Sequence, residues 1–431
     1  MNVSFFWFRR DLRLQDNTGF TAALKGKTPV IPLFIFDQDI LSELPKNDPR
    51  VQFIHQQLAI LNETLGKHKS GILVKKGSPL EVWKLLFSEF EIDAIYTNGD
   101  YEPYALERDT AIENLCEQHQ AQFHTFKDQV IFEKDEVMKD DGTPYTVFTP
   151  FKRKWLQRLQ EHGLPKVAAP NYANLSEHSE PFPSLSDIGF EPSAIIVPQY
   201  HLDQVSDYEN TRNFPAIKGT SFLSTHLRFG TVGIRDMVRK ALELNEVFLS
   251  ELIWREFFMQ ILFHFPRVVH NNFRPKYDGI EWRNNPDDFK RWCEGNTGYP
   301  LVDAGMRELN ETGLMHNRVR MVTASFLCKH LLIDWRWGEA YFAQKLLDFD
   351  LSANNGNWQW AAGTGCDASP YFRVFNPTSQ LKKFDPELQY TLKWVPEYEG
   401  FGYPEPMVEH KMARERALAT YKAGIEASQS N

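Results

Sequence analysis

The sequence lacks several features that mark common classes of protein. It has only four cysteines, at positions 116, 293, 328 and 366. They are far apart and form no CxxC pair, which argues against a zinc site or a disulfide framework and is typical of a reducing cytosol. No apolar run is long enough to span a membrane, and charges follow the short apolar start, the reverse of a signal peptide. We therefore expect a cytoplasmic protein with no metal and no membrane attachment.

Two further absences narrow the choice of ligand. The chain contains no GxGxxG or Walker loop, which disfavours an ordinary dinucleotide or P-loop site. Its formal net charge of −9 argues against loose, charge-driven binding of nucleic acid, but a local basic cleft stays compatible with it. Most of the excess acid lies early in the chain, because residues from Tyr200 onward include 27 Lys and Arg against 29 Asp and Glu.

The first third of the chain alternates β-rich and helical segments. Strands are expected at 3–8, 30–36, 72–75, 94–97 and 122–126, and helices at 50–68, 79–90 and 104–119. This alternation predicts a Rossmann-like α/β domain over residues 1–130, with a parallel sheet covered by helices on both faces. The charged run Arg9, Arg10, Asp11 and Arg13 follows the first strand. It is interpreted either as a solvated surface or as a contact with a second domain.

The remaining two thirds change character twice. Residues 131–199 are rich in proline and are expected to form a connector with one helix at 151–161. From residue 200 the apolar spacing is helical, which predicts an all-helical domain over 200–431. Its helices are expected at 205–213, 221–228, 234–245, 251–265, 286–294, 301–312, 317–332 and 337–347, with another near 411–423.

One segment of this second domain is unusually rich in tryptophan. Residues 334–377 contain Trp335, Trp337, Trp358 and Trp360. A buried indole N–H needs a partner, so a purely structural core would favour Leu, Ile and Val. An Asn-Asn-Gly sequence before Trp358 is interpreted as a hinge. The segment is either a Trp-rich core or a site for a flat aromatic ligand, and the rest of the chain favours the second.

Two smaller patterns are also candidates for binding. The segment from Lys218 to Ser224 precedes an expected helix, where its Thr and Ser serve either as helix caps or as part of a phosphate site. Glu251 and Arg255 are spaced i and i+4, so they share one helix face, with Trp254 beside them.

Several long motifs, in the same order, resemble the DNA photolyase/cryptochrome family. They are FFWFRRDLRLQDN (5–17), WREFF (254–258), TGYPLVDAGMREL (297–309), GLMHNRVRMVTASFL (313–327), LLIDWRWGE (331–339), DFDLSANNGNWQWAAGTG (348–365) and PYFRVFNP (370–377). The resemblance covers essentially the whole chain and is greatest to the class I photolyases for cyclobutane pyrimidine dimers. It implies light-driven repair of such dimers by electron transfer from photoexcited, fully reduced flavin adenine dinucleotide (FAD) to a flipped-out lesion.

The resemblance also implies which residues would hold the FAD in the helical domain. Asn354 would face the N5 edge of the flavin, and Arg320 would pair with Asp348 close to the ring. The residues expected to bind the cofactor are Tyr208, Thr220, Ser221, Phe222, Leu223, Ser224, Phe248, Arg255, Arg320, Asp348, Phe349, Asp350 and Asn354.

For the lesion, the resemblance implies an aromatic wall and a hydrogen-bonding acid. Trp254 and Trp360 would stack on the dimer, and Glu251 would hydrogen-bond a pyrimidine carbonyl. Asn317 and Met321 would complete the pocket, and the DNA backbone would be bound by Arg212, Arg318 and Arg373. A chain of indoles to the surface, through which oxidised flavin is reduced, would be formed by Trp358, Trp335 and Trp282.

Three other functions are compatible with parts of the pattern. A plant-type photoreceptor commonly has Asp where Asn354 stands, a (6-4) photolyase has a His-rich lesion pocket, and a non-enzymatic DNA-binding module needs no indole series. Leu314 and Phe248 replace a Trp that is frequent in relatives. We expect a monomer that binds UV-damaged DNA. The sequence does not decide whether an antenna chromophore is present or whether it is a folate, a deazaflavin or a flavin.

Overall fold

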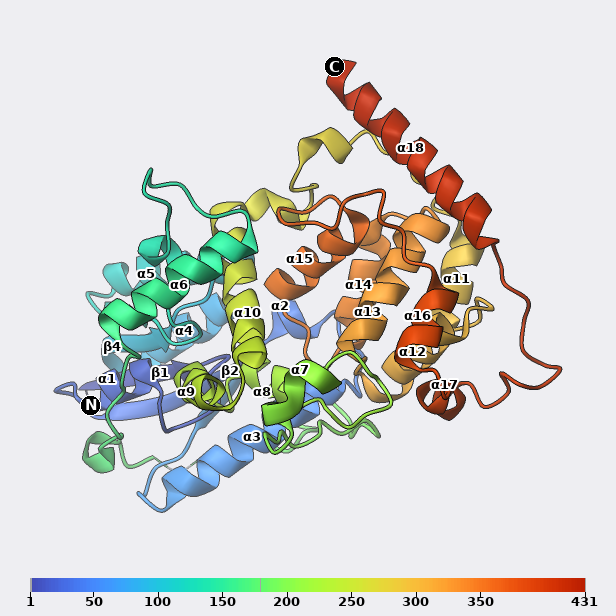
Figure 1. Cartoon of the computed structure of the whole chain (residues 1–431). Coiled ribbons are helices and arrows are strands. Elements are labelled where there is room, and N and C mark those ends of the chain that lie inside the picture. The colour runs from blue at the N-terminus through green and yellow to red at the C-terminus, as the bar shows by residue number, and fades with distance from the viewer. Residues whose placement is uncertain (1, 179, 431) are drawn as a thin grey trace. The chain divides into compact units, whose positions relative to one another are not determined.

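The chain forms two compact units in a computed structural model that describes residues 2–178 and 180–430 (Figure 1). The first unit comprises Met1–Val137, Lys154–Tyr200 and Phe222–Glu243. The second comprises Met138–Arg153, His201–Ser221 and Leu244–Asn431. The two units divide the chain differently from the expected domains, because each unit contains parts of both 131–199 and 200–431. The expected boundaries at residues 130 and 199 stay a prediction.

The first unit is built on a parallel sheet of five strands in the order β3-β2-β1-β4-β5. The strands are β1 (Asn2–Phe8), β2 (Val30–Asp37), β3 (Leu73–Gly77), β4 (Glu91–Asn98) and β5 (Gln122–Phe126). In the register, Phe5 of β1 lies between Ile31 of β2 and Ile95 of β4. The parallel α/β fold expected from the sequence is confirmed.

Helices cover both faces of this sheet because side chains alternate along each strand. Phe5 and Trp7 of β1 pack edge-on against Trp83 of α4 (5.4 and 5.7 Å between ring centroids). Phe6 and Phe8 point the other way and meet Phe20 of α1. The helices of the first unit are α1 (Thr18–Leu24), α2 (Gln38–Leu41), α3 (Pro49–Gly66), α4 (Pro79–Glu89), α5 (Pro103–Gln118), α8 (Leu223–Arg228) and α9 (Ile234–Leu244), whereas α6 (Phe148–His162) is divided between the two units at Arg153. Helix α1 has only seven residues and was not expected.

The charged run after β1 is not a solvated surface. The side chain of Arg9 is only 9 % exposed and forms an ion pair with Asp109. Arg10 Nη1 lies 3.1 Å from Asp100 Oδ1 and 2.8 Å from Glu102 Oε1. These partners belong to the first unit, so the run is satisfied within it and the expectation of solvated charges is wrong.

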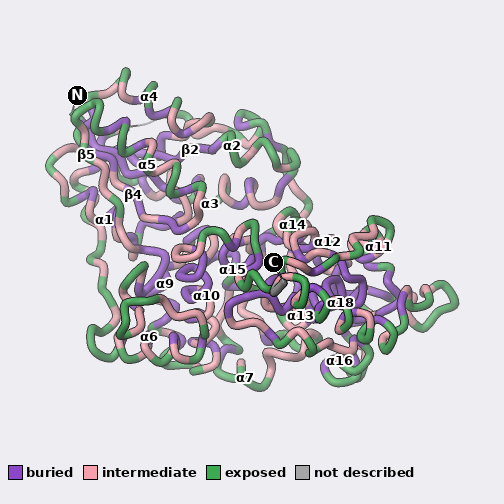
Figure 2. The backbone as a smooth tube through the Cα atoms, turned by 90° about the horizontal axis from the view of Figure 1, so that it is seen from above, coloured by how far each residue is buried: buried purple, intermediate pink, exposed green. Residues whose placement is uncertain are grey.

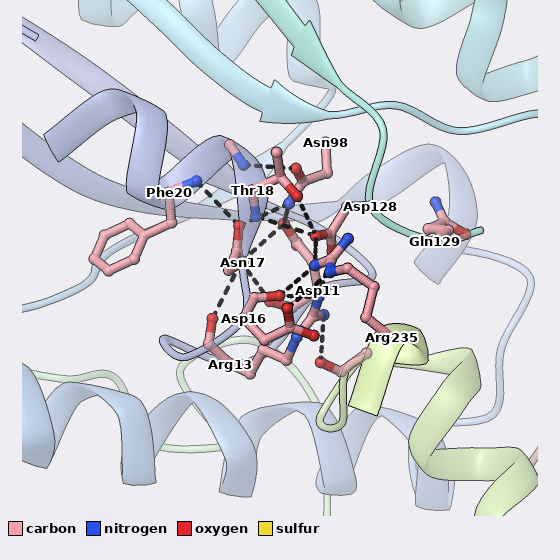
Figure 3. Close-up of polar contacts among 12 residues, drawn as sticks. Asp11, Arg13, Asp16, Asn17, Thr18, Phe20, Asn98, Asp128, Gln129 and Arg235 are labelled. Atoms are coloured by element: carbon pink, nitrogen blue, oxygen red, sulfur yellow. Dashed lines mark hydrogen bonds and ion pairs between the residues drawn. The ribbon is translucent and has the colours of Figure 1, made fainter. Parts of the chain in front are cut away.

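A second charged cluster in the first unit is centred on Asp128 (Figure 3). Asp128 accepts hydrogen bonds from Nη2 of Arg13 (2.5 Å) and Nη2 of Arg235 (2.6 Å). Arg235, on α9, also donates through Nε to Asp16 (2.7 Å). Burial alone would raise the pKa of Asp128, but the two guanidinium charges lower it below its ordinary value. The cluster therefore ties the end of β1, the start of α1 and α9 together.

The second unit is almost entirely helical, as expected. Its helices are α7 (Tyr208–Thr211), α10 (Glu246–His264), α11 (Pro286–Glu294), α12 (Pro300–Thr312), α13 (Asn317–Ser325), α14 (Trp335–Lys345), α15 (Leu351–Ala362), α16 (Pro377–Phe384), α17 (Gln389–Trp394) and α18 (His410–Ser430). The helix expected at 317–332 ends at Ser325 and continues as a π-helical turn, Phe326–His330. Short 3₁₀ turns lie at Lys134–Glu136, Tyr172–Asn174, Val205–Asp207, Pro266–Val269 and Pro275–Tyr277.

Helix α15 is central to this unit, and it contains the segment that was expected to be a hinge. Asn354, Asn355 and Gly356 lie inside the helix, so that expectation is wrong. Asn355 Nδ2 donates to the backbone oxygen of Val268 (3.0 Å). A Cβ on Gly356 would lie 2.1 Å from Cδ1 of Phe258 on α10. The segment thus allows close packing of α15 against α10, and Figure 2 shows both helices largely in the colour of buried residues.

Among residues 2–178 and 180–430, no helix combines the length and apolar character needed to cross a membrane. The same residues contain no group of three or more His, Cys, Asp and Glu side chains placed to hold a metal ion.

Candidate functional site

Most of the predicted site residues lie on helices of the second unit that pack around α15. Helices α10, α13 and α14 contact α15, and α7 contacts α10. Three of the expected cofactor residues, Phe222, Leu223 and Ser224, belong to the first unit.

An ion pair at the start of α15 joins two of these residues. Arg320 donates through Nη1 and Nη2 to the two carboxylate oxygens of Asp348 (3.2 and 3.0 Å). Its Nε donates to the backbone oxygen of Met315 (2.8 Å), which fixes the plane of the guanidinium. The expected pairing is confirmed, and it holds a positive charge beside α15.

Next along the chain, Phe349 and Asp350 have structural contacts of their own. Phe349 packs against the main core of the unit. Asp350 is the N-cap of α15 and accepts hydrogen bonds from the Ser352 hydroxyl and from the backbone N–H of Ala353 (3.2 Å). Their assignment to the cofactor stays a prediction.

The side-chain amide of Asn354 makes a hydrogen bond through its nitrogen only. Its Nδ2 donates to the backbone oxygen of Glu339 (3.1 Å). The Oδ1 atom accepts no hydrogen bond from the described residues, although Asn354 is only 8 % exposed. A buried acceptor of this kind fits the N5 edge of a flavin, which carries a proton in the reduced ring.

Glu339 was quoted in a motif but was not identified as a site residue. Its side chain is close to both Asn354 and Asn355, and burial raises its pKa to about 7. The sequence held no signal for this, because the acid reaches the amides only when α14 packs on α15.

The three indoles of the expected electron chain lie in one continuous core. Trp358 and Trp335 are 2 % and 0 % exposed, and Trp282 is half-buried at the edge of the same cluster. Trp335 Nε1 donates to Asn272 Oδ1 (2.9 Å). Trp282 is therefore the most exposed of the three, as the outer end of a path from the interior to the solvent requires.

Glu251 and Arg212 form an ion pair that was not expected. Arg212 follows α7 and Glu251 is on α10, and their Nη1 and Oε1 atoms are 2.6 Å apart. The guanidinium carbon also lies 5.2 Å from the ring centre of Tyr208. Tyr208 in turn meets Phe248 edge-on at 5.3 Å, which makes this corner aromatic on one side and charged on the other.

The two pKa values in this corner are both raised. Burial and the charge of Glu251 raise the pKa of Tyr208 to about 12. Burial raises the pKa of Glu251, and the charge and hydrogen bond of Arg212 offset only part of that rise.

Trp254 has a stacking partner that the sequence did not reveal. The ring of Phe148 lies parallel to its indole, with an interplanar angle of 8° and 3.7 Å between centroids. The backbone N–H of Phe148 donates to Asp367 Oδ2 (2.9 Å), which anchors the ring to the loop after α15. Since Trp254 is half-buried, Phe148 fixes its plane without covering it completely.

The other residues expected to contact substrate differ in how far they are exposed. Asn317 and Arg373 are exposed, whereas Arg255, Met321 and Trp360 are half-buried. Arg318 is also half-buried: its guanidinium lies 4.3 Å from the ring centre of Phe384 and donates to Asn213 Oδ1 (2.6 Å).

The segment with Thr220 and Ser221 does not cap a helix as expected. Helix α8 begins at Leu223, and Phe222 takes the N-cap position in a left-handed conformation (φ 54°) with no side-chain cap. Ser224 lies inside this helix of six residues, and the assignment of the segment to a phosphate or to the cofactor stays a prediction.

Comparison with known proteins assigns the family. Residues 4–171 match the family described as DNA photolyase, and residues 248–402 match the FAD binding domain of DNA photolyase. The chain is 37 % identical to the deoxyribodipyrimidine photo-lyase of Escherichia coli, over 98 % of this chain and 99 % of that protein.

Two solved structures share the fold. A class III photolyase from Agrobacterium tumefaciens has a TM-score of 0.88 at 35 % identity, covering 99 % of this chain and 98 % of that one. A photolyase from Sulfolobus tokodaii, which contains two FAD molecules, has a TM-score of 0.85 at 35 % identity, covering 98 % and 100 %. With such similarity along the whole length, and an FAD-binding domain over the helices described above, the chain belongs to the DNA photolyase family.

Proposed function

We propose that this chain is a deoxyribodipyrimidine photo-lyase, an enzyme that repairs cyclobutane pyrimidine dimers in DNA with the energy of light. The observation that carries the proposal is the contact between α14 and α15. Asn354 and Trp358 are four residues apart and therefore share a face of α15. They meet consecutive residues of α14, since Asn354 donates to Glu339 and Trp358 packs on Gly338. One helix thus carries both the flavin-facing amide and the first indole.

The residues of the cofactor site have distinct roles in this proposal. FAD, when bound in its fully reduced form, supplies the electron that light transfers to the lesion. Asn354 accepts a hydrogen bond through Oδ1, and Arg320 contributes a positive charge that favours an anionic ring. Tyr208, Phe248 and Arg255 surround the cofactor, together with Thr220, Ser221, Phe222, Leu223, Ser224, Asp348, Phe349 and Asp350.

The lesion has to leave the duplex to reach this site. Flipping a base out costs a few kcal/mol, and least for a damaged base that stacks and pairs poorly. Trp254 and Trp360 stack on the flipped dimer, Glu251 hydrogen-bonds its carbonyl edge, and Asn317 and Met321 line the pocket. Arg212, Arg318 and Arg373 bind backbone phosphates. Trp282, Trp335 and Trp358 pass an electron inward when the flavin is oxidised.

A photoreceptor or a (6-4) photolyase is the alternative from the same family. Asn354, in place of Asp, and His316-Asn317-Arg318 favour the enzyme for cyclobutane dimers. Assignment to class I stays a prediction. The enzyme is further proposed to be a cytoplasmic monomer that acts on single- or double-stranded DNA, with the identity of any antenna chromophore left to its absorption spectrum.

A repair assay tests the proposal. Reduced protein is mixed with thymine-dimer DNA and illuminated with near-UV and blue light, and a dark sample serves as the control. Loss of dimers only in the light supports the enzyme. Photoreduction of the flavin without repair of this substrate would contradict the proposal, and a (6-4) substrate would then separate the two alternatives.

A further inference from the structure

The outermost indole of the proposed electron path, Trp282, lies in residues 280–285, a segment with no helix or strand ahead of α11. The next indole inward, Trp335, is the first residue of α14. Within residues 2–178 and 180–430, no ring contact joins the two indoles: Trp282 meets Tyr421 edge-on, and Arg336 lies over Trp335. The distance between the indoles is therefore set by how the backbone of the first segment is held against the residues before α14.

Hydrogen bonds join these two segments directly beside the indoles. The backbone N–H of Arg283 donates to the backbone oxygen of Leu332 (2.7 Å), and its Nη1 donates to the backbone oxygen of Leu331 (3.1 Å). In the opposite direction, the backbone N–H of Asp334 donates to Oδ1 of Asn284 (2.8 Å). Since Asp334 is the N-cap of α14, this last bond ties the segment of the outer indole to the start of that helix.

Both sides of this contact have an unusual backbone conformation. Asn284 (φ 46°) and Leu332 (φ 50°) are left-handed. Asn tolerates this conformation because its short amide can hydrogen-bond locally, whereas Leu rarely adopts it. A residue held in this way persists only where the surrounding structure determines it. The side chain of Leu332 is buried in a cluster that also contacts Trp282, so the segment is held in one geometry.

We propose that Asn284 is a positioning residue for the outer step of the electron path, because its side-chain oxygen holds the segment of Trp282 at one distance from Trp335. This inference rests on the proposed function. In that step Trp282 gives one electron to the Trp335 radical cation, which returns to a neutral indole while Trp282 becomes the radical cation. Photoexcited oxidised FAD is the oxidant that starts the series. Transfer between two rings slows exponentially with their separation, so even a small loosening of this support lowers the rate.

Two substitutions separate the amide oxygen of Asn284 from its backbone conformation. Asn284→Gly keeps the left-handed conformation at no steric cost but removes the oxygen that accepts from Asp334. Asn284→Asp keeps an oxygen acceptor and tolerates the same conformation. Asn285→Ala is the matched control, because Asn285 accepts from the N–H groups of Asp287 (2.9 Å) and Asp288 (3.0 Å) and its loss disturbs the start of α11 instead.

Flash photoreduction of the full-length protein with oxidised FAD measures the step. Asn284→Gly should lower the yield of lasting FAD reduction several-fold, because the electron returns to the inner indoles before Trp282 can supply its own. Asn284→Asp and Asn285→Ala should photoreduce like wild type, and all four proteins should repair dimers equally after chemical reduction. Hydrogen–deuterium exchange in the dark is a readout independent of light, in which residues 331–335 should exchange faster in Asn284→Gly alone.

The outcomes distinguish the inference from the function on which it rests. Normal photoreduction by Asn284→Gly would overturn the inference, and so would an equal loss in Asn285→Ala or in Asn284→Asp. Wild-type protein whose oxidised FAD does not photoreduce would overturn the electron path itself. Failure of chemically reduced wild type to repair dimers would overturn the proposed enzyme and leave the comparison of the variants unaffected.

Discussion

At the scale of single residues, three residues of the proposed site each contact a side chain that fixes the plane, the charge or the hydrogen bonding of the residue. Phe148 touches Trp254, Arg212 touches Glu251, and Glu339 touches Asn354. None of these three contacts could be predicted from spacing, because the partners are far apart in the chain and meet only through helix packing.

Phe148 is expected to hold the plane of Trp254. Stacked aromatic pairs contribute about 0.5–1.5 kcal/mol beyond their buried area. Phe148→Leu should therefore weaken binding of lesion DNA about two- to tenfold while FAD content and repair per photon at saturating DNA stay unchanged. Phe148→Tyr, which preserves the stack, should bind like wild type in the same fluorescence titration. Equal weakening by both variants would contradict a role that depends on stacking.

Glu339 is expected to make the stability of the second unit depend on pH. Its pKa in the folded protein is about 7, above the ordinary value of a glutamic acid. The stabilisation is fully present below the unfolded pKa and is lost as pH rises through 7, because the unfolded chain ionises more easily. Since Gln does not ionise, Glu339→Gln should reduce the pH-dependent loss of unfolding free energy by up to about 3 kcal/mol. Thermal unfolding of the wild type and of Glu339→Gln at pH 5 and pH 8 measures this difference. An equal change in Tm between the two pH values in both proteins would contradict the role given to Glu339.

At the scale of elements, close approach between helices depends on glycines where a methyl group has no room. A Cβ on Gly338 of α14 would lie 2.1 Å from Cη2 of Trp358. Such overpacking typically costs about 1–3 kcal/mol.

Gly338→Ala should therefore lower stability by about that amount and slow photoreduction of oxidised FAD, since Trp358 is displaced. Gly66→Ala, at the exposed end of α3 where nothing lies within 4 Å, is the matched control. It should be neutral or slightly stabilising. Chemical unfolding and flash photoreduction together measure the difference, and unchanged photoreduction in Gly338→Ala would place the indole outside the electron path.

The buried cluster around Asp128 acts at the same scale. Removing its charge leaves Arg13 without its carboxylate partner and Arg235 with Asp16 alone, and breaking a buried pair in this way costs about 3–5 kcal/mol. Asp128→Asn should thus destabilise the first unit by this amount. Asp236→Asn removes an exposed partner of Arg239 and Lys240 on α9 and should cost less than about 1 kcal/mol. If urea unfolding gave the same loss of unfolding free energy for Asp128→Asn and Asp236→Asn, the cluster around Asp128 would not stabilise the first unit as predicted.

Elements were predictable where local periodicity determines them. All five strands were expected, because alternation and β-branched or aromatic residues mark a strand in its own sequence. Asn354-Asn355-Gly356 was misinterpreted as a hinge, because its helical state depends on Phe258 and Val268 of neighbouring elements. The N-cap of α8 was likewise not predictable from the segment, since Phe222 takes that position in a left-handed conformation instead of Thr220 or Ser221.

At the scale of the whole molecule, the core of the second unit links its interior to solvent. Helix α15 lies at one end of this path with Asn354 and Trp358, and Trp282 lies at the other. Trp282 is also in edge contact with Tyr421 of α18 (5.8 Å). The sequence motifs indicated the three indoles, but only the packing shows that they share one cluster in which Trp282 is the most exposed.

This arrangement separates activation of the cofactor from repair. Trp282→Phe should remove the exposed end of the indole series, so photoreduction of oxidised FAD should fall at least tenfold, since a phenyl ring is far harder to oxidise than indole. Repair by protein reduced chemically beforehand should stay at the wild-type level, because the electron that repairs the dimer does not cross Trp282.

Trp394→Phe, in the same core but outside the series, is the control and should photoreduce normally. Absorbance changes under blue light and dimer loss with pre-reduced protein measure the two steps. If pre-reduced Trp282→Phe also failed to repair, Trp282 would belong to the substrate site and the path assigned to it would be wrong.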